Sequence, residues 1–121
     1  MRSVLLVALG GAVGAVARYG IGMAGVRWGA AGLPWGTWAA NALGCLLIGL
    51  ALPLVRDDGA RLAVLVGGLG AFTTFSTYAA DTVLLWEGGR PGWAVANAAG
   101  SVGVGLACVL LGLWAGRQLG A

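Results

Sequence analysis

The 121-residue sequence has no histidine, no lysine and only two cysteines, Cys45 and Cys108. A His/Cys metal site, a His-based catalytic triad and a disulfide framework are therefore excluded. Charge is also scarce, because seven arginines and four acids make up 9% of the chain, whereas a soluble domain carries about a quarter. So few charges cannot solvate the surface of an ordinary soluble enzyme of this size, and that class is excluded too.

Apolar residues dominate what is present. Hydrophobic residues make up 60% of the chain, with 24 glycines besides, which excludes a disordered chain. A helix needs about 20 predominantly apolar residues to cross the hydrocarbon core of a bilayer. The sequence predicts an all-α membrane protein in which a single domain, residues 1–121, forms four transmembrane helices. The stretches of sufficient length are residues 4–23, 35–55, 62–86 and 92–116.

The arginines give little information about orientation. With four spans, the N-terminus, the middle connector and the C-terminus lie on one side of the membrane. That side carries four arginines and the other side two, so the positive-inside bias is weak. Copies inserted in both orientations would assemble as an antiparallel dual-topology homodimer, whereas a fixed topology would be set by the N-terminus. The charges leave both arrangements open.

Glycines recur at a spacing that favours close helix packing. Small residues four positions apart let helix backbones approach each other in lipid. Gly10 with Gly14 and Gly112 with Gly116 follow this spacing. The pattern is common in membrane proteins, and in these thin, glycine-rich helices it favours oligomerisation.

Polar residues within the spans indicate function, because polarity is costly in lipid. Arg18 interrupts the first span, and it either reaches the membrane interface or faces an aqueous vestibule. Thr37 and Asn41 share one helical face in the second span, and Asn97 and Ser101 have the same spacing in the last. Each pair either lines a path or forms hydrogen bonds between helices.

The third span contains the run GGLGAFTTFSTY at residues 67–78. Glycines followed by hydroxyl residues make a poor continuous helix, because glycine is flexible and Ser and Thr compete for backbone hydrogen bonds. Non-helical backbone in mid-membrane is tolerated only where protein or a water-filled cavity surrounds it. We therefore expect a third helix broken mid-membrane, with freed carbonyls that can bind a small cation. A hydroxyl-rich packing motif is the alternative.

Three motifs follow one another along the chain: GGAVGAVARYG at 10–20, GTWAANALGCLLIG at 36–49 and GGLGAFTTFSTYAAD at 67–81. In their order and spacing they resemble the Fluc (CrcB) family of small fluoride channels. The resemblance implies a fluoride-selective channel that passively exports fluoride from the cytoplasm through the cell membrane. It also implies an antiparallel homodimer with two separate pores. The expected partners are fluoride, the bilayer and a second copy of the chain, with no nucleic acid among them.

The same resemblance implies roles for individual residues. A structural sodium ion, which is not transported, would be held by the backbone carbonyls of Gly70 and Thr73. Two rings would face fluoride at Phe75 and Tyr78, where the family's usual second residue is Phe. The hydroxyl that Tyr78 adds would either donate to the anion or block its path. The other expected residues of the fluoride pore are Thr37, Asn41, Ser101 and Arg18.

Two rival interpretations come from other classes of protein. A small four-helix, proton-coupled multidrug antiporter needs a membrane-embedded carboxylate. The first predicted span offers only Arg18, which has the wrong sign, and Asp81 near the end of the third span is the one acid inside a span. A non-transporting assembly subunit would not need a broken third helix. No residue set combines a nucleophile with a base, so we expect no enzyme activity.

Overall fold

The computed structural model describes residues 1–29 and 32–120, and the regular structure of these residues is helical. Four segments are long and apolar enough to cross a membrane, which confirms the predicted number of spans. Residues 30 and 31, within the first predicted connector, lie outside the described residues. The elements are α1 (Arg2–Trp28), α2 (Trp35–Leu54), α3 (Asp58–Arg61), the π-helix η1 (Leu62–Leu69), α4 (Gly70–Phe72), α5 (Phe75–Glu87) and α6 (Pro91–Leu119).

Local chemistry explains where several helices begin. Asp57 caps α3, because its Oδ1 accepts a hydrogen bond from the Ala60 N–H at 2.8 Å. Helix α6 begins with Pro91, at a position where the missing N–H would have had no helical partner. The turn before α6 contains Gly89 at φ +72°, a conformation that glycine adopts without strain.

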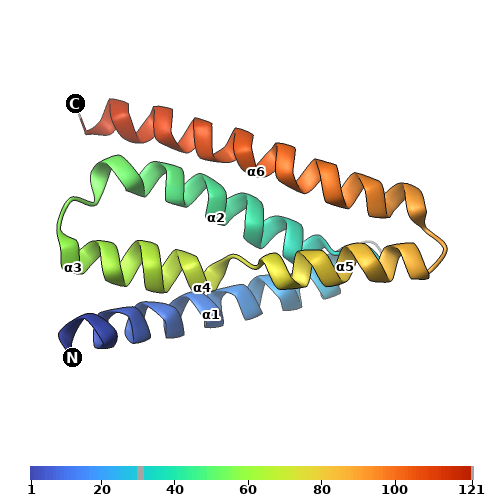
Figure 1. Cartoon of the computed structure of the whole chain (residues 1–121), viewed down its shortest axis with the longest axis horizontal. Coiled ribbons are helices and arrows are strands. Elements are labelled where there is room, and N and C mark those ends of the chain that lie inside the picture. The colour runs from blue at the N-terminus through green and yellow to red at the C-terminus, as the bar shows by residue number, and fades with distance from the viewer. Residues whose placement is uncertain (30–31, 121) are drawn as a thin grey trace.

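The four spans run alternately in opposite directions (Figure 1). Both termini and the corner between α2 and α3 lie at one end of the molecule, and the turn between α5 and α6 lies at the other. This arrangement confirms the predicted sidedness of the termini and the middle connector. Helix α2 packs most extensively against α6, α1 packs against η1, and α5 packs against α6.

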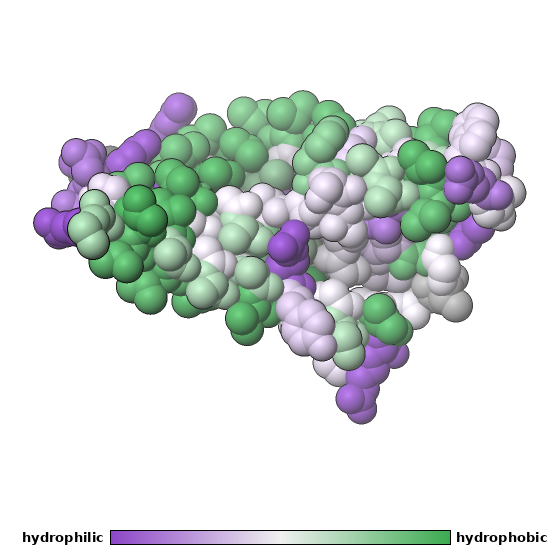
Figure 2. Space-filling view, turned by 60° about the horizontal axis from the view of Figure 1, so that its bottom comes forward, coloured by the Kyte–Doolittle hydropathy of each residue, from purple (hydrophilic) through white to green (hydrophobic). Residues whose placement is uncertain are grey.

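Large apolar side chains are exposed on every span. Examples are Val13 on α1, Leu46 on α2, Val83 on α5 and Leu110 on α6. Figure 2 shows apolar residues over much of one face, with hydrophilic residues at its two ends, near its middle and on the projection at the bottom. An apolar surface of this extent is suited to lipid and not to water. The chain is a multi-pass membrane protein.

The predicted glycine pairs are used for packing inside the chain. A Cβ atom on Gly10 or Gly14 would collide with backbone atoms of η1, and one on Gly112 or Gly116 would collide with the backbone of α2. The backbones of α1 and η1, and of α6 and α2, are therefore in direct contact. The pairs hold one copy together, and oligomerisation of the chain stays a prediction.

Gly14→Ala should destabilise the protein by about 1–3 kcal/mol, the usual cost of forcing extra volume into a packed contact. The added methyl group meets the backbone carbonyl of Gly68, which cannot move aside as a flexible side chain would. The measurement is the free energy of unfolding of the detergent-solubilised protein.

Gly100→Ala is the matched control, because a Cβ at Gly100 meets no atom within 4 Å. It should leave stability unchanged or raise it, since alanine is the better helix former. Equal stabilities of the two variants would show that the contact between α1 and η1 is not close-packed.

Candidate functional site: a broken helix beside a polar path

The third span is interrupted between α4 and α5. Thr73 (φ −84°, ψ 158°) and Thr74 (φ −147°, ψ 116°) are extended, and they lie near the middle of the segment Asp58–Glu87. The π-helix η1 precedes them, and helical irregularities of this kind are frequent at functional sites. The predicted interruption of the third helix is confirmed.

The side chain of Asn41 on α2 bonds to both backbone groups of Thr74. Its Oδ1 accepts a hydrogen bond from the Thr74 N–H at 2.8 Å, and its Nδ2 donates to the Thr74 carbonyl at 3.0 Å. A side-chain amide offers the same donor and acceptor as a peptide group. Since buried backbone groups need partners, this amide stabilises an extended residue at membrane depth.

Thr74 is buried and caps the first turn of α5. Its Oγ1 accepts a hydrogen bond from the Thr77 N–H at 3.2 Å, and it donates to Thr77 Oγ1 at 3.0 Å. Ser76 Oγ lies 3.2 Å from the same oxygen. Capping satisfies a free N–H of the first turn, so α5 begins at once after the break. The positive end of its dipole therefore points to the break.

The break leaves backbone carbonyls without helical donors. The Thr74 N–H bonds to Asn41, so it does not reach the Gly70 carbonyl. The Thr77 N–H donates to Thr74 Oγ1, so it does not donate to the Thr73 carbonyl, its usual acceptor in a continuous helix. Gly70 is exposed on the surface of the chain. Carbonyl oxygens are hard ligands, and this pair suits a small hard cation.

Phe75 and Tyr78 lie side by side on the first turn of α5. Their ring centroids are 5.4 Å apart with an angle of 46° between the ring planes. Phe75 is 79% exposed in the single chain. The Tyr78 hydroxyl donates to the Ala98 carbonyl of α6 at 2.9 Å, which ties the ring to that helix.

Asn97 connects three helices and is only 1% exposed. Its Oδ1 accepts hydrogen bonds from the Trp38 indole N–H of α2 and, at 3.1 Å, from Ser101 Oγ of α6. Its Nδ2 donates to Thr82 Oγ1 at 2.8 Å and to the Tyr78 carbonyl at 3.3 Å, both on α5. The predicted pair of Asn97 and Ser101 is thus joined directly and also serves as a contact between helices.

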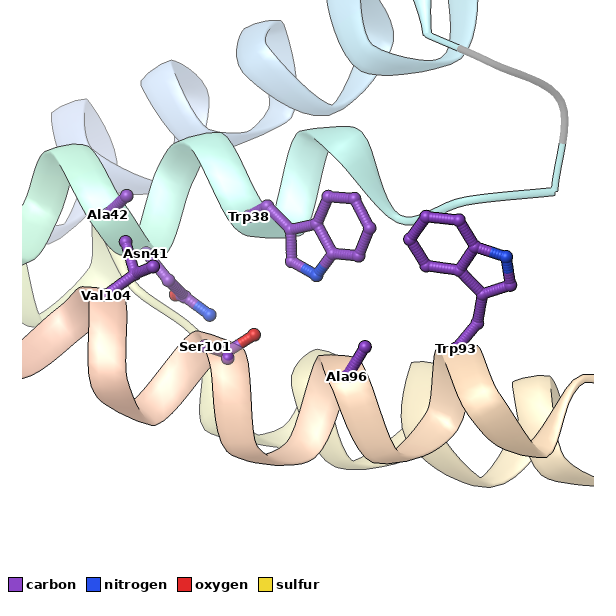
Figure 3. A pocket seen from close by; sticks show the side chains of 8 residues that line it. Trp38, Asn41, Ala42, Trp93, Ala96, Ser101 and Val104 are labelled. Carbon is purple, nitrogen blue, oxygen red and sulfur yellow. The ribbon is translucent and has the colours of Figure 1, made fainter.

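Two cavities lie along the seam between α2 and α6, and Asn41 and Ser101 line both. The first has a volume of about 300 Å³. Figure 3 shows the indole rings of Trp38 and Trp93 at one end of it, with Asn41 and Ser101 toward the other. The second, of about 420 Å³, passes the break and reaches Phe75. Two polar side chains therefore stand between two largely apolar chambers.

Comparison with known proteins identifies the family. The model of the family described as CrcB-like protein, Camphor Resistance (CrcB), matches residues 5–113. The chain belongs to the CrcB family. It is 48% identical over 118 residues to the fluoride-specific ion channel FluC of Paracoccus denitrificans, which covers 95% of this chain and 94% of that protein. FluC of Thermus thermophilus is 46% identical, with 98% of each chain covered. FluC of Allorhizobium ampelinum is 43% identical, with 98% of this chain and 99% of that protein covered.

CrcB-family membership confirms the resemblance that the three sequence motifs indicate. The named relatives are ion channels and not enzymes. The second cavity gathers most of the residues that the sequence singles out for a site. These are Asn41, Gly70, Thr73, Phe75, Tyr78 and Ser101.

Two predicted site residues of this CrcB-family chain lie elsewhere in the part that the structure describes. Thr37 Oγ1 donates to Asp81 Oδ2 at 2.7 Å, which joins the start of α2 to α5. Arg18 is half-buried on α1, a helix that packs against η1, α2 and α4 and not against α5 or α6. The structure of one chain therefore does not bring Arg18 to the cavities.

Sequence reasoning missed Trp38 and Thr74. No spacing rule relates Trp38 to Asn97, because the two residues are 59 positions apart. Thr74 belongs to the hydroxyl run that predicts the break, but that run does not show which hydroxyl caps α5. The only sequence signal for the contact of Trp38 with Asn97 is that Trp38 lies between the polar residues Thr37 and Asn41.

Proposed function

We propose that this CrcB-family chain is a fluoride-specific ion channel of the cell membrane, through which fluoride leaves the cytoplasm passively. The pair of cavities that meet at Asn41 and Ser101, beside Phe75 and Tyr78, carries the proposal. The names of relatives with 43% to 48% identity over nearly the whole chain support it.

Hydrogen-bond donors and ring edges account for anion passage. Fluoride is small and strongly hydrated, so a pore must replace its water with well-placed partners. Asn41 Nδ2 has a second N–H beyond the one bonded to Thr74. The rings of Phe75 and Tyr78 have positive edges that attract an anion weakly. Weak partners in series let an ion leave as readily as it enters.

The Tyr78 hydroxyl has a different role from its ring. Because it donates to the Ala98 carbonyl, it is not free to donate to fluoride. Of the two alternatives for this phenol, a direct bond to the anion is therefore the less favoured. The hydrogen bond to Ala98 instead holds the Tyr78 ring in place, at the position where the family usually has Phe.

Arg18 and Thr37 lie outside both cavities, and we assign them to the approach to the path. A fixed cation within the narrow part would hold the anion too strongly for conduction. At the approach, Arg18 raises the local concentration of anions without binding one permanently. Thr37 contributes through its bond to Asp81, which keeps that carboxylate attached to α2.

Passive flow suffices for export. Hydrofluoric acid is a weak acid that crosses membranes uncharged and ionises in the less acidic cytoplasm, where fluoride accumulates. An inside-negative potential drives an anion outward with about 2.3 kcal/mol per 100 mV. An open anion path thus lowers cytoplasmic fluoride, and with it fluoride toxicity, without coupling to protons.

We further propose that two copies assemble as an antiparallel dual-topology homodimer around a structural sodium ion. The carbonyls of Gly70 and Thr73 have lost helical donors, and Gly70 is exposed on the surface of the single chain. One chain offers too few ligands to enclose a cation, whereas a twofold axis at the break doubles them. When bound, the ion neutralises the carbonyl dipoles of the two breaks and is not transported.

Phe75→Ile should abolish fluoride efflux from liposomes, measured with a fluoride electrode. Isoleucine keeps apolar bulk but removes the positive ring edge. Tyr78→Phe should conduct, because it loses only the bond to Ala98 and keeps the ring, whereas Tyr78→Ile should conduct poorly. Val83→Ile, at an exposed position on the same helix, is the control and should match the wild type.

The same assay separates a channel from a proton-coupled antiporter. Wild-type efflux should proceed under a membrane potential with no pH gradient. Efflux that requires a proton gradient, or wild-type flux of Phe75→Ile as an intact dimer, would contradict the proposed mechanism.

Dual topology should appear as labelling from both faces of one membrane. In a chain with Cys45 and Cys108 replaced by Ala, Asp58→Cys places a thiol at the corner between α2 and α3. Replacing an acid leaves the arginine count, which governs orientation, unchanged. An impermeant maleimide should label part of the protein in sealed vesicles and the remainder only after permeabilisation. Labelling of all or none before permeabilisation would show a fixed topology.

A further inference from the structure

Two hydrogen-bond partners determine the orientation of the Asn97 amide, because one can only donate and the other can only accept. The Trp38 indole N–H only donates, and it bonds to Asn97 Oδ1. The Tyr78 carbonyl only accepts, and it lies 3.3 Å from Asn97 Nδ2. The amide oxygen therefore faces α2 and the amide nitrogen faces α5, and the reverse arrangement would break both bonds.

This orientation determines where the hydroxyl hydrogen of Ser101 points. Ser101 Oγ lies 3.1 Å from Asn97 Oδ1, which can only accept, so Ser101 donates its one hydrogen to Asn97. Toward the two cavities that it lines, Ser101 then presents oxygen lone pairs. Lone pairs repel an anion, so Ser101 has to turn its hydroxyl away from Asn97 before it binds one.

We propose that Trp38 is a positioning residue that allows Ser101 to donate to the transported anion. This inference rests on the proposed fluoride function. A hydroxyl rotates readily, so the cost of the turn depends on what Asn97 loses. With the indole N–H in place, Asn97 Oδ1 keeps one donor when Ser101 turns to fluoride. Without it, the turn leaves a buried carbonyl oxygen unpaired.

The Trp38 N–H acts on fluoride only through the two hydrogen bonds that Trp38 and Ser101 donate to Asn97 Oδ1, which together form the relay. This indole N–H points to Asn97 and is therefore not a ligand of the anion. The indole ring lines the first cavity next to Trp93, with ring centroids 6.3 Å apart. The ring and the N–H thus have separable roles, and Phe in place of Trp38 removes the N–H while it keeps an aromatic ring.

Trp38→Phe should lower fluoride efflux from liposomes at least about fivefold, the factor equivalent to about 1 kcal/mol for an unpaired buried acceptor. Trp114→Phe, at an exposed position of α6 that lines neither cavity, is the matched control and should stay near the wild-type rate. In the described part of the chain Asn97 bonds to Trp38, Ser101, Thr82 and Tyr78, and not to Trp114.

The Ser101→Ala background separates the relay from a structural role. If Trp38 acts through the Ser101 hydroxyl, Ser101→Ala lowers the flux and Trp38→Phe lowers it no further in that background. An equal loss from Trp38→Phe with and without Ser101 would overturn the relay. A wild-type rate of fluoride efflux in Trp38→Phe alone or in Ser101→Ala alone would also overturn the relay.

A second measurement needs no variant at position 38. Fluoride added to the ¹⁵N-labelled protein in nanodiscs should shift the Trp38 indole N–H resonance downfield, because its bond to Asn97 Oδ1 strengthens when Ser101 leaves. The Trp114 indole, which lines neither cavity, should not shift, and chloride should shift neither. Absence of the Trp38 shift in a wild-type protein that conducts fluoride overturns the relay alone, whereas a wild-type protein that conducts no fluoride overturns the proposed function as well.

Discussion

The two hydrogen bonds between the Asn41 side chain and the backbone of Thr74 are the interaction on which the rest of the site depends. A helix broken inside a bilayer exposes peptide groups that lipid cannot satisfy. The Asn41 amide supplies both missing partners at the most buried point of the break. The same bonds direct the Thr74 N–H away from Gly70, so the Gly70 carbonyl is left without a helical donor. One side chain on α2 therefore permits the break and shapes the polar surface beside it.

Close packing of the long helices supports this arrangement. Glycines of α1 bring its backbone into contact with that of η1, and glycines of α6 bring its backbone into contact with that of α2. Within that frame a second network, centred on Asn97, joins α2, α5 and α6 through side-chain hydrogen bonds. The cavities are thus bordered by close-packed helices, and the amides of Asn41 and Asn97 are held in fixed directions.

The sequence predicts the spans and the break but not the contacts between them. Length and hydropathy determine four helices, and the glycine and hydroxyl run at 67–78 determines that the third one is interrupted. The sequence marks Asn41 as a polar residue inside a span, but its partner Thr74 lies 33 positions away and the contact depends on tertiary packing. The same holds for Trp38 and Asn97. The spacing of the glycine pairs predicts close helix contacts, yet spacing alone does not distinguish a neighbouring helix of the same chain from one of another copy.

Hydrogen exchange at the Thr74 amide shows whether the Asn41 side chain satisfies the backbone of the break. In wild-type protein in nanodiscs, this amide should be protected, because its N–H is bonded to Asn41 Oδ1. In Asn41→Ala it should exchange rapidly while amides of α6 stay protected, and Cys45→Ala, one turn along the same face of α2, should leave it protected. Unchanged protection of Thr74 in Asn41→Ala would show that the break does not depend on the hydrogen bonds from Asn41.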